Sequence, residues 1–287
     1  MNAQRDTAHG DRKNILRYVW LSLLPGFGVV SQNKLVRMCK SIENCFLEDA
    51  DELLYRDSLS NAKERIGKKR LEVFIRSREK QEEENRARSV IEECKHKHIS
   101  IITVDDPEYP HRFKGLPDMP CVLYVRGNLR VNDYKRTSGV VGARRCSENG
   151  KQSAIMITNS EVKKGAAIIS GMAKGIDSYA HTAALKKEGY TIAVLGNGVD
   201  ICYPEEHERL YEEIVRKGCA LSEYPPGTKP REYSFPKRNR LIAALSDGLF
   251  VIDVGRHSGT ETTAKACELY GRTVTRISLE INSQPFS

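Results

Sequence analysis

Short apolar runs alternate with longer stretches of helical periodicity from about residue 99 to the end of the chain. The apolar runs are rich in Val, Ile and Ala and predict strands at 100–104, 122–126, 139–141, 166–170, 191–195, 220–222, 249–253 and 273–277. The stretches between them predict helices at about 148–164, 176–187, 205–217, 236–245 and 262–270. This alternation indicates βαβ units, and therefore a mainly parallel sheet covered by helices on both faces.

The earlier part of the chain shows helical periodicity without strand candidates. A proline and two glycines within 24–28 mark a tight turn between a first amphipathic helix and a second that begins at about Ser31. The segment 76–97 is dense in charges of both signs at helical spacing, which predicts one solvated connecting helix.

These patterns predict four regions: a disordered tail at 1–11, a small helical domain at 12–78, a connecting helix at 79–98 and an α/β domain at 99–287. The predicted fold class is therefore α/β, with an extended Rossmann-like, mainly parallel sheet that has helices on both faces. A small all-α domain precedes this sheet.

Composition narrows the function classes only a little. The chain has 287 residues and a formal net charge of +8, which weakly favours a polyanionic partner. No apolar stretch approaches the ~20 residues of a membrane span, and residues 1–10 contain no signal-peptide core, so we expect a cytoplasmic protein with no membrane partner. None of the eight cysteines forms a Cys-x-x-Cys pair, so we expect reduced thiols and no metal site.

Ligands of a parallel α/β sheet bind beyond the carboxyl ends of the strands, so the loops there hold the candidate site. The loop after 139–141 offers Gly142 for close backbone approach and Arg144 as a fork for phosphate. The loop after 166–170 places Ser170, Gly171 and Lys174 before a helix, where backbone N–H groups favour an anion.

Two further loops have small residues suited to phosphate: Gly196 and Gly198 after 191–195, and Ser258, Gly259 and Thr260 before the last helix. For the first of these loops, the alternative interpretation is a simple turn.

Asp177 and His181 lie one turn apart on the helix that follows Lys174. A catalytic pair is conceivable, but capping and helix packing are the favoured interpretation, because caps are common and catalytic pairs are rare.

The segment 234–240, SFPKRNR, combines one aromatic residue with three cations. Cations fit phosphates and an aromatic face fits an unstacked base, so Phe235, Lys237, Arg238 and Arg240 indicate a single-strand nucleic-acid site. A basic surface helix explains the segment equally well when it is taken alone.

The sequence does not support a nicotinamide-dependent dehydrogenase or a P-loop ATPase. The spacing Gly-x-Gly-x-x-Gly is absent after the first strand of the α/β core, since Gly142 stands alone until Gly150. No Gly-x-x-x-x-Gly-Lys-Ser/Thr loop is present either.

Taken in order, these loops resemble the DNA-processing protein A family, also called DprA or Smf. The resemblance covers roughly 99–274 and rests on the motifs VGAR (141–144), SGMAKGID (170–177), AVLGNGVD (193–200), SEYP (222–225), FPKRNRLIA (235–243) and SGT (258–260). The front of the chain is similar to the small sterile-alpha-motif or helix-hairpin-helix domain that this family often carries.

The resemblance implies a single-stranded-DNA binding protein of natural transformation, or competence. Such a protein protects incoming DNA and helps load the RecA recombinase for homologous recombination, works as a homodimer, and needs no cofactor or catalytic activity. Arg144, Lys174 and the three cations of 237–240 would then line the phosphate pocket, and Phe235 would stack a base. Ser170 and Gly171 would supply backbone contacts, and Asn239 would orient the loop or bond a base.

The sequence departs from this family in three places. Asp253-Val254 stands where Glu-Ala is usual, Glu261 stands where an apolar residue is expected, and the Val-Pro-Gly turn after the last motif is missing. The closing part of the fold is therefore expected to be truncated or divergent, and dimerisation and RecA loading follow less directly than DNA binding.

Two alternatives share the same loops. Nucleotide phosphoribohydrolases carry a catalytic glutamate three residues after Gly-Thr, whereas Thr263 occupies that place here. A nucleotide-sensing module explains the glycine loops but leaves Phe235 and its three cations unexplained.

Overall fold

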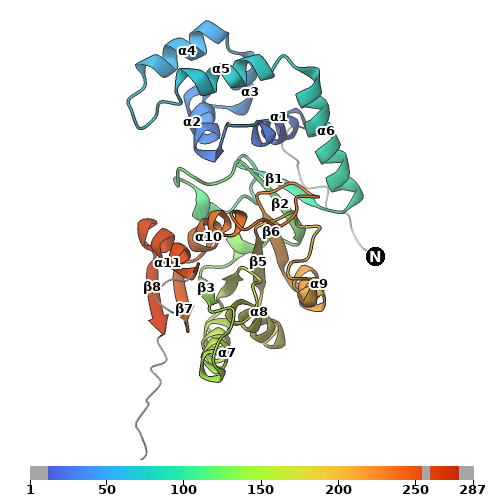
Figure 1. Ribbon diagram of the computed structural model, residues 1–287, viewed down its shortest axis with the longest axis vertical. Helices are drawn as coiled ribbons and strands as arrows, with labels where there is room; N and C mark the ends of the chain where they lie inside the picture. The colour runs from blue at the N-terminus through green and yellow to red at the C-terminus, as the bar shows by residue number, and fades with distance from the viewer. Residues whose placement is uncertain (1–11, 254–258, 278–287) are drawn as a thin grey trace, which may run out of the picture. The chain divides into compact units, whose positions relative to one another are not determined.

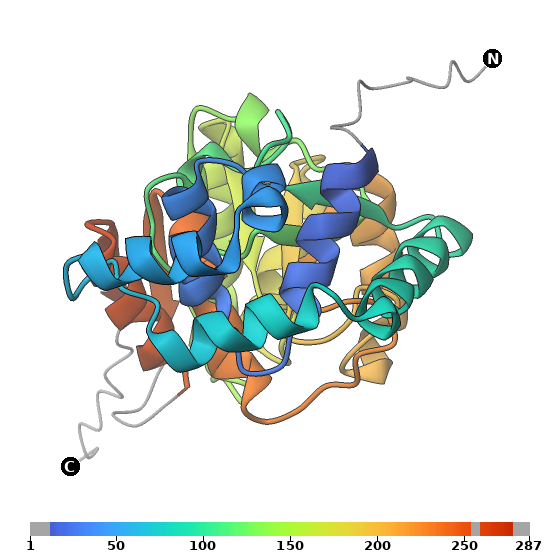
Figure 2. The same cartoon turned by 90° about the horizontal axis from the view of Figure 1, so that it is seen from above.

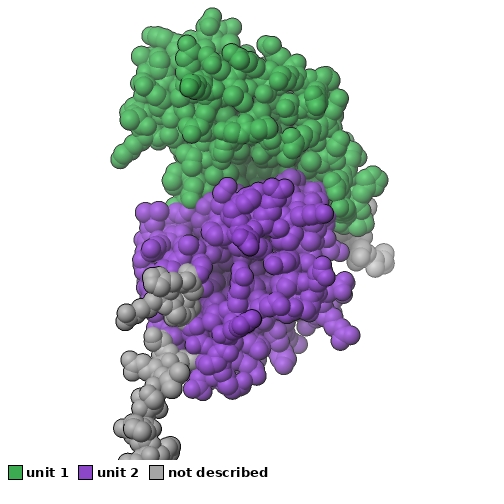
Figure 3. Space-filling view, in the orientation of Figure 1, with its two compact units in different colours: residues 1–109, 114–124 green, residues 110–113, 125–287 purple. Residues whose placement is uncertain are grey.

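The computed structural model describes residues 12–253 and 259–277. The chain divides into two compact units: unit 1 comprises Met1–Tyr109 with Lys114–Tyr124, and unit 2 comprises Pro110–Phe113 with Val125–Ser287 (Figure 3). The predicted disordered tail at 1–11 lies outside the described residues. The domain limits at 78 and 98 remain a proposal, since the compact units divide the chain by contacts and not by element type.

Unit 1 begins with the helical region that the sequence predicts. Its helices are α1 (Arg12–Leu23), α2 (Val29–Cys39), α3 (Ile42–Leu47), α4 (Ala50–Leu59), α5 (Lys68–Ser77) and α6 (Gln81–His96). The strand β1 (Ser100–Thr103) and the first half of β2 (Val122–Gly127) follow. Helices α1 and α6 pack side by side, as both views of the ribbon show (Figures 1 and 2). The all-helical start of the chain is thus confirmed.

An aromatic cluster fills the centre of the helical region. The ring centroid of Phe74 lies 5.7 Å from that of Trp20 and 5.6 Å from that of Phe46, both edge-on. Phe27, from the turn after α1, is buried and lies 6.0 Å from Phe74. The side-chain amide of Gln32 donates to the carbonyl of Phe27 at 2.8 Å. This turn is therefore anchored by its own aromatic residue in the core of the helical region.

The charged segment 76–97 contains the last two residues of α5 and, after a turn, the single helix α6, which lies within the predicted connecting helix at 79–98. Helix α5 ends at Ser77, and the N–H of Lys80 donates to the carbonyl of Ser77 at 3.0 Å to form a turn before α6. The guanidinium of Arg78 donates to the carbonyl of Glu48 at 2.7 Å. This long-range hydrogen bond stabilises the turn between the two helices. The turn itself, residues 78–80, contains no glycine or proline that would mark it in the sequence.

Unit 2 is built on parallel strands, and every predicted strand of the α/β region is present. These strands are β3 (Thr137–Gly142), β4 (Ala167–Ser170), β5 (Thr191–Leu195), β6 (Cys219–Ser222), β7 (Gly248–Ile252) and β8 (Thr273–Ile277). Their spatial order is β6-β5-β4-β3-β7-β8, with parallel pairing throughout. In the β3–β7 pair, Val140 lies opposite Phe250. The Rossmann-like, mainly parallel fold class is confirmed.

Helices cover both faces of this sheet. The connections are α7 (Glu148–Lys163), α8 (Ile176–Lys186), the short η3 (Glu205–His207) with α9 (Glu208–Lys217), α10 (Ser234–Leu245) and α11 (Thr260–Leu269). Because βαβ crossovers are right-handed, α7, α8 and α9 cover one face while α10 and α11 cover the other. The contacts agree, since α7 and α9 pack on α8 and α10 packs on α11 (Figure 1).

The direction of winding changes between β3 and β7. The chain moves from β3 towards β4 on one side, and from β7 towards β8 on the other. The loops that leave β3 and β7 therefore turn to opposite faces and open a crevice at the carboxyl ends of the strands. Ligands of this fold class bind at such a switch point.

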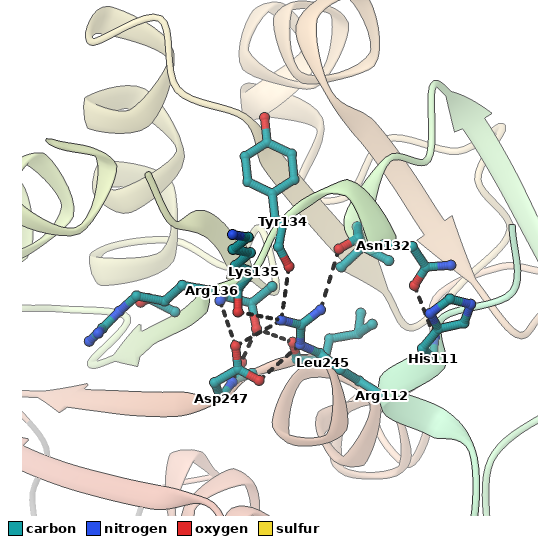
Figure 4. A network of polar contacts seen from close by, with 12 residues as sticks. His111, Arg112, Asn132, Tyr134, Lys135, Arg136, Leu245 and Asp247 are labelled. Carbon is teal, nitrogen blue, oxygen red and sulfur yellow. Dashed lines mark hydrogen bonds and ion pairs between the residues drawn. The ribbon is translucent and has the colours of Figure 1, made fainter. Parts of the chain in front are cut away.

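A polar network ties the segment Pro110–Phe113 to the rest of unit 2 (Figure 4). Arg112 donates from Nε and Nη2 to the two carboxylate oxygens of Asp247 at 2.9 and 2.8 Å. The same guanidinium donates to the carbonyl of Tyr134 at 3.1 Å, and the N–H of Thr137 donates to Asp247 at 2.8 Å. Asp247 thus joins Arg112 to the start of β3.

This network predicts a contribution of Asp247 to acid stability. Burial alone would raise the pKa of Asp247, but the hydrogen bonds from Arg112 and Thr137 outweigh burial and hold it below its ordinary value. Because the pKa is depressed in the folded state, the stabilisation is present above the unfolded pKa of about 3.9 and is lost as the pH falls through the folded value. We expect Asp247→Asn to lower the free energy of unfolding by about 2 kcal/mol at pH 7, measured by urea unfolding.

The difference between Asp247→Asn and the parent protein is expected to shrink as the pH falls towards 3. Asp133→Asn is the matched control, because Asp133 forms an exposed ion pair with Arg130 and such pairs contribute little. A difference that stays constant down to low pH would show that packing, and not the charge of Asp247, is responsible.

Candidate nucleic-acid interface

A cavity of about 520 Å³ opens at the switch point between β3 and β7. Its walls come from the ends of these strands, the β4–α8 loop, α10 and the start of α11. The described lining residues are Val141, Gly142, Ala143, Arg144, Ala173, Asp177, Phe235, Pro236, Arg238, Asn239, Ile242, Gly259, Thr260 and Thr263. The volume is that of a small-molecule or single-nucleotide site.

A smaller hollow of about 70 Å³ shares the Arg144 side of the cavity. Lys174, Tyr203 and Phe235 line it together with Arg144. Four residues from three separate loops and one helix are thus brought together. Two of them are cations and two are aromatic, which is the combination that single-strand sites use.

Arg144 and Lys174 are the exposed cations of this group. The Arg144 guanidinium lies 6.0 Å from the centroid of the Phe235 ring. The Lys174 ammonium pairs with Glu206 at 2.6 Å, with both side chains more than half exposed. An exposed pair of this kind is worth about 0–1 kcal/mol, so a phosphate can replace the carboxylate at small cost.

Phe235 is half-buried at the start of α10. One side of its ring stacks on Tyr203, with centroids 5.5 Å apart and planes at 27°. A side chain at Gly196 would meet this ring, since a Cβ there would lie 3.0 Å from Cδ1 of Phe235. The glycine therefore makes room for the aromatic residue that the cavity presents.

Arg238 lies in a different environment from the one that a phosphate ligand requires. Its side chain is buried, and Nη1 donates to the carbonyl of Gly171 at 2.7 Å and to that of Val194. Burial lowers its pKa to about 10, which the nearby Asp177 carboxylate partly opposes. Arg238 forms one wall of the cavity, but its hydrogen bonds hold the ends of β4 and β5 together.

Asn239, Arg240 and Lys237, the other predicted site residues of α10, have three different surroundings. The Asn239 amide donates to the carbonyl of Gly259 at 3.1 Å and to the hydroxyl of Thr262 at 3.0 Å, so it orients the loop before α11. Arg240 forms a two-point ion pair with Glu223 at 3.1 and 2.7 Å and does not line the cavity. Lys237 is exposed, and its ammonium lies 5.2 Å from the centroid of the Tyr233 ring.

Ser170 faces inward, whereas Gly171 lines the smaller hollow. The Ser170 hydroxyl donates to the carbonyl of Val140 at 2.6 Å, inside the sheet. A Cβ on Gly171 would lie 2.6 Å from the guanidinium of Arg238, so the glycine makes room for that side chain. Gly142 lines the cavity, but a Cβ there would lie 2.2 Å from the carbonyl of Ile252, so its neighbour strand also requires glycine.

The two candidate phosphate loops differ. Gly196 and Gly198 line neither hollow, and the N–H of Gly198 donates to the carbonyl of Thr228 at 2.9 Å. Gly259 and Thr260 do line the larger cavity, and a Cβ at Gly259 would meet nothing within 4 Å. Ser258 lies outside the described residues.

Asp177 and His181 are buried and point to different partners. Oδ2 of Asp177 accepts from the N–H groups of Gly171 at 3.1 Å and Ala173 at 3.4 Å, so this carboxylate clamps the β4–α8 loop. Burial raises the pKa of Asp177 and lowers the pKa of His181 to about 3. Nδ1 of His181 lies 2.8 Å from the hydroxyl of Thr191. Packing and loop support, and not a catalytic pair, account for both residues.

Asp253 and Glu261, two of the positions at which the sequence differs from the family, both have partners within the protein. Oδ2 of Asp253 accepts from the N–H of Ser147 at 2.5 Å and from its hydroxyl at 3.0 Å, which supports the start of α7. Glu261 pairs with Arg276 on β8 at 3.2 Å and does not line the cavity.

Sequence reasoning did not assign Tyr203, Glu206 or Thr263 to the site. Tyr203 enters only beside Pro204, among the residues that resemble the family, and Thr263 only by its place three residues after Thr260. Glu206 had no local signal, because its partner Lys174 is 32 positions away.

Within residues 12–253 and 259–277, no group of three or more His, Cys, Asp or Glu side chains is placed to hold a metal ion. Over the same part of the chain, no helix is both long enough and apolar enough to cross a bilayer.

Comparison with known sequences gives a consistent set of relatives. The family model described as DNA recombination-mediator protein A matches residues 100–287. Protein Smf of Synechocystis is 40% identical over 190 residues, which are 64% of this chain and 47% of that protein. DNA processing protein DprA of Bacillus subtilis is 37% identical over 61% of this chain and 59% of its own length. The chain thus spans about half to three fifths of these curated relatives.

Two solved structures have similar folds. DNA processing protein A from Streptococcus pneumoniae aligns with a TM-score of 0.74 and 29% identity, covering 94% of this chain and 88% of that one. DNA processing protein A from Helicobacter pylori, solved in a study of its single-stranded DNA binding mode, aligns with a TM-score of 0.59 and 31% identity. That alignment covers 64% of this chain and 84% of the other.

Proposed function

The chain belongs to the DNA recombination-mediator protein A family, and on that premise we propose that it binds single-stranded DNA at the switch-point cavity. In this role it acts as a binding protein of natural transformation that protects incoming DNA, and not as an enzyme. The Helicobacter pylori relative, whose single-stranded DNA binding mode has been studied, supports the ligand class.

One observation carries the proposal. Two exposed cations, Arg144 and Lys174, stand beside the half-buried ring of Phe235 at the mouth of an open cavity. Phosphates along a single strand suit the cations, and an unstacked base suits the ring. A double helix offers no free base face at this position, so we expect preference for the single strand.

The proposed roles of the individual residues follow from their surroundings. Arg144 and Lys174 contact phosphates, Phe235 stacks a base, and the open backbone at Gly259 and Thr260 faces the ligand. Asn239 holds that loop in place. Arg238, Arg240, Ser170 and Gly171 support the architecture, since their hydrogen-bonding groups are used within the protein.

The family resemblance extends the proposal to partners. We expect a homodimer that works in the cytoplasm and helps load RecA onto the bound strand. Sedimentation of the protein alone tests the dimer. Strand exchange by RecA on DNA that is already coated with a single-strand binding protein tests loading, because a loader shortens the lag and a simple binder does not.

Fluorescence anisotropy of a labelled oligo-dT single strand, compared with duplex DNA at two salt concentrations, tests DNA binding directly. We expect salt-sensitive preference for the single strand, because binding releases counterions from the neutralised phosphates. Equal affinity for the duplex, or no binding by the folded protein, would contradict the proposal.

Arg144→Ala and Lys174→Ala are each expected to weaken single-strand binding about tenfold, which corresponds to about 1.4 kcal/mol. Each should also flatten the dependence of log affinity on log salt by about 0.7, the value for one phosphate on a single strand. Anisotropy titrations at several salt concentrations measure both effects. Arg145→Ala is the matched control, because Arg145 is exposed but lines neither hollow. An equal loss in Arg145→Ala would indicate a general charge effect.

A second candidate is a small nucleotide ligand, which the cavity volume of about 520 Å³ favours. Such a ligand would compete with a short oligonucleotide, and its affinity would not grow with strand length. A phosphoribohydrolase is not supported, because no carboxylate that the structure describes near the cavity is available for catalysis. Glu261 forms an ion pair with Arg276. Asp177 is the one carboxylate in the described lining of the cavity, and it accepts backbone hydrogen bonds.

A further inference from the structure

A second groove, of about 450 Å³, lies over α7, α8, η3 and the start of α9. It is on the face of the sheet opposite α10 and shares no lining residue with the switch-point cavity. Three cationic side chains line it: Lys151 from α7, Lys186 from α8 and Arg209 from α9. Three helices thus direct positive charge into one hollow.

These cations are largely free of carboxylate partners. Lys186 and Arg209 are exposed and make no ion pair with any residue that the structure describes. Lys151 lies 3.2 Å from Glu148, whose side chain is 67% exposed. Glu206 is the one carboxylate in the described lining of the groove, and it is already paired with Lys174. An anionic ligand therefore meets net positive charge here.

The groove also has an aromatic wall. Tyr179 of α8 is half-buried among the lining residues, and the ammonium of Lys151 lies 5.6 Å from the centroid of its ring. Ile155 and Leu210 add apolar surface. Cations around an aromatic ring form the arrangement that accepts phosphates and a stacked base.

The groove begins where the first site ends. Lys174 lines the hollow next to Phe235, and its partner Glu206 lines the groove, with 2.6 Å between them. The carbonyl of Met172, in the same loop as Lys174, lies 3.2 Å from Nδ1 of His207 in the groove. Because Lys174 and Glu206 are in contact, the two hollows are adjacent, and one strand can extend from the first into the second.

We propose that this groove is a second subsite for the same single strand, in which Lys186, Arg209 and Lys151 contact phosphates and Tyr179 stacks a base. The inference rests on the proposed function, since the strand first occupies the cavity beside Arg144. A strand too short to cross Lys174 occupies the first site alone. A longer strand occupies both.

Strand length therefore tests the proposal. The double variant Lys186→Ala/Arg209→Ala is compared with the parent protein by anisotropy, using oligo-dT of about 5 and about 16 nucleotides, within the range that single-strand sites cover. For the long strand we expect at least about tenfold weaker binding and a salt slope smaller by about 1.4, the value for two phosphates. For the short strand we expect no change.

Lys187→Ala/Arg216→Ala is the charge-matched control, because both residues are exposed, lie on α8 or its cap and on α9, and do not line the groove. Its affinity for either strand is expected to match the parent. Equal loss in the control, or unchanged binding of the long strand by the groove variant, would overturn the second subsite while leaving the first intact. Failure of the parent protein to bind either strand would overturn the proposed function itself.

A local readout separates a bound strand from a change in shape. In Tyr179→Trp, the indole reports on the groove, while the natural Trp20 is buried in unit 1 and gives a constant background. We expect the long strand to quench the added fluorescence and the short strand to leave it unchanged. Equal quenching by both strands would place the first site, and not a second one, at Tyr179.

Discussion

Arg238→Ala is expected to lower the free energy of unfolding by about 3–5 kcal/mol, the range seen when one partner of a buried charged network is removed. The substitution leaves the buried carboxylate of Asp177 without its nearby positive charge. It also leaves the carbonyls of Gly171 and Val194 without the donor that joins them. Each buried polar group left unsatisfied costs about 1–3 kcal/mol. Urea unfolding followed by circular dichroism measures the loss.

Lys237→Ala is the control for this effect, because Lys237 is the adjacent cation and is exposed. We expect its stability to change by no more than about 0.5 kcal/mol. If Arg238→Ala were as stable as Lys237→Ala but failed to bind DNA, Arg238 would be a ligand-binding cation and the structural assignment would fall.

Phe235→Ala is expected to weaken single-strand binding by about 1–3 kcal/mol, which is the usual value of one base stack. The ring is half-buried against Tyr203 and beside Gly196, so its removal also takes away packing at the mouth of the cavity. Anisotropy titration with oligo-dT measures the loss of affinity. The dependence on salt should stay unchanged, because Phe235 carries no charge.

Phe235→Leu separates stacking from packing. Leucine fills much of the same space but offers no aromatic face, so we expect a stable protein with nearly the same loss of affinity as Phe235→Ala. Full affinity in Phe235→Leu, together with a destabilised Phe235→Ala, would show that the ring serves the core and does not stack a base.

The fold was largely predictable, and the strands show why. Each of the predicted strands in the α/β region is found within two residues of its expected limits. Strands β3 to β6 are buried along their whole length, and apolar runs of this kind can be recognised from the local sequence alone. Among the helices between them, α7 also begins at a locally encoded cap, since the N–H of Gly150 donates to the Ser147 hydroxyl. The turn at residues 78–80 falls at the predicted limit between the helical domain and the connecting helix, and Arg78 in this turn donates to the distant carbonyl of Glu48.

The candidate site was predictable in place but not in detail. The glycine loops and the SFPKRNR segment located the carboxyl edge of the sheet, and Arg144, Lys174 and Phe235 do meet there. The three cations of 237–240 looked alike in the sequence. In the structure Lys237 is exposed, Arg238 is buried under the strand ends, and Arg240 is paired with Glu223.

By itself, therefore, the sequence determined the order of strands and helices, the edge of the sheet that holds the candidate site, and the family. Only the tertiary structure decided which cations are available to a ligand. The physical reason is that the charge of a side chain can be read from its own position in the sequence, whereas its hydrogen-bond and ion-pair partners lie far away along the chain. Glu223 lies 17 positions from Arg240, and Gly171 lies 67 positions from Arg238. Folding alone brings these groups together, and it leaves Arg144 exposed at the mouth of the cavity.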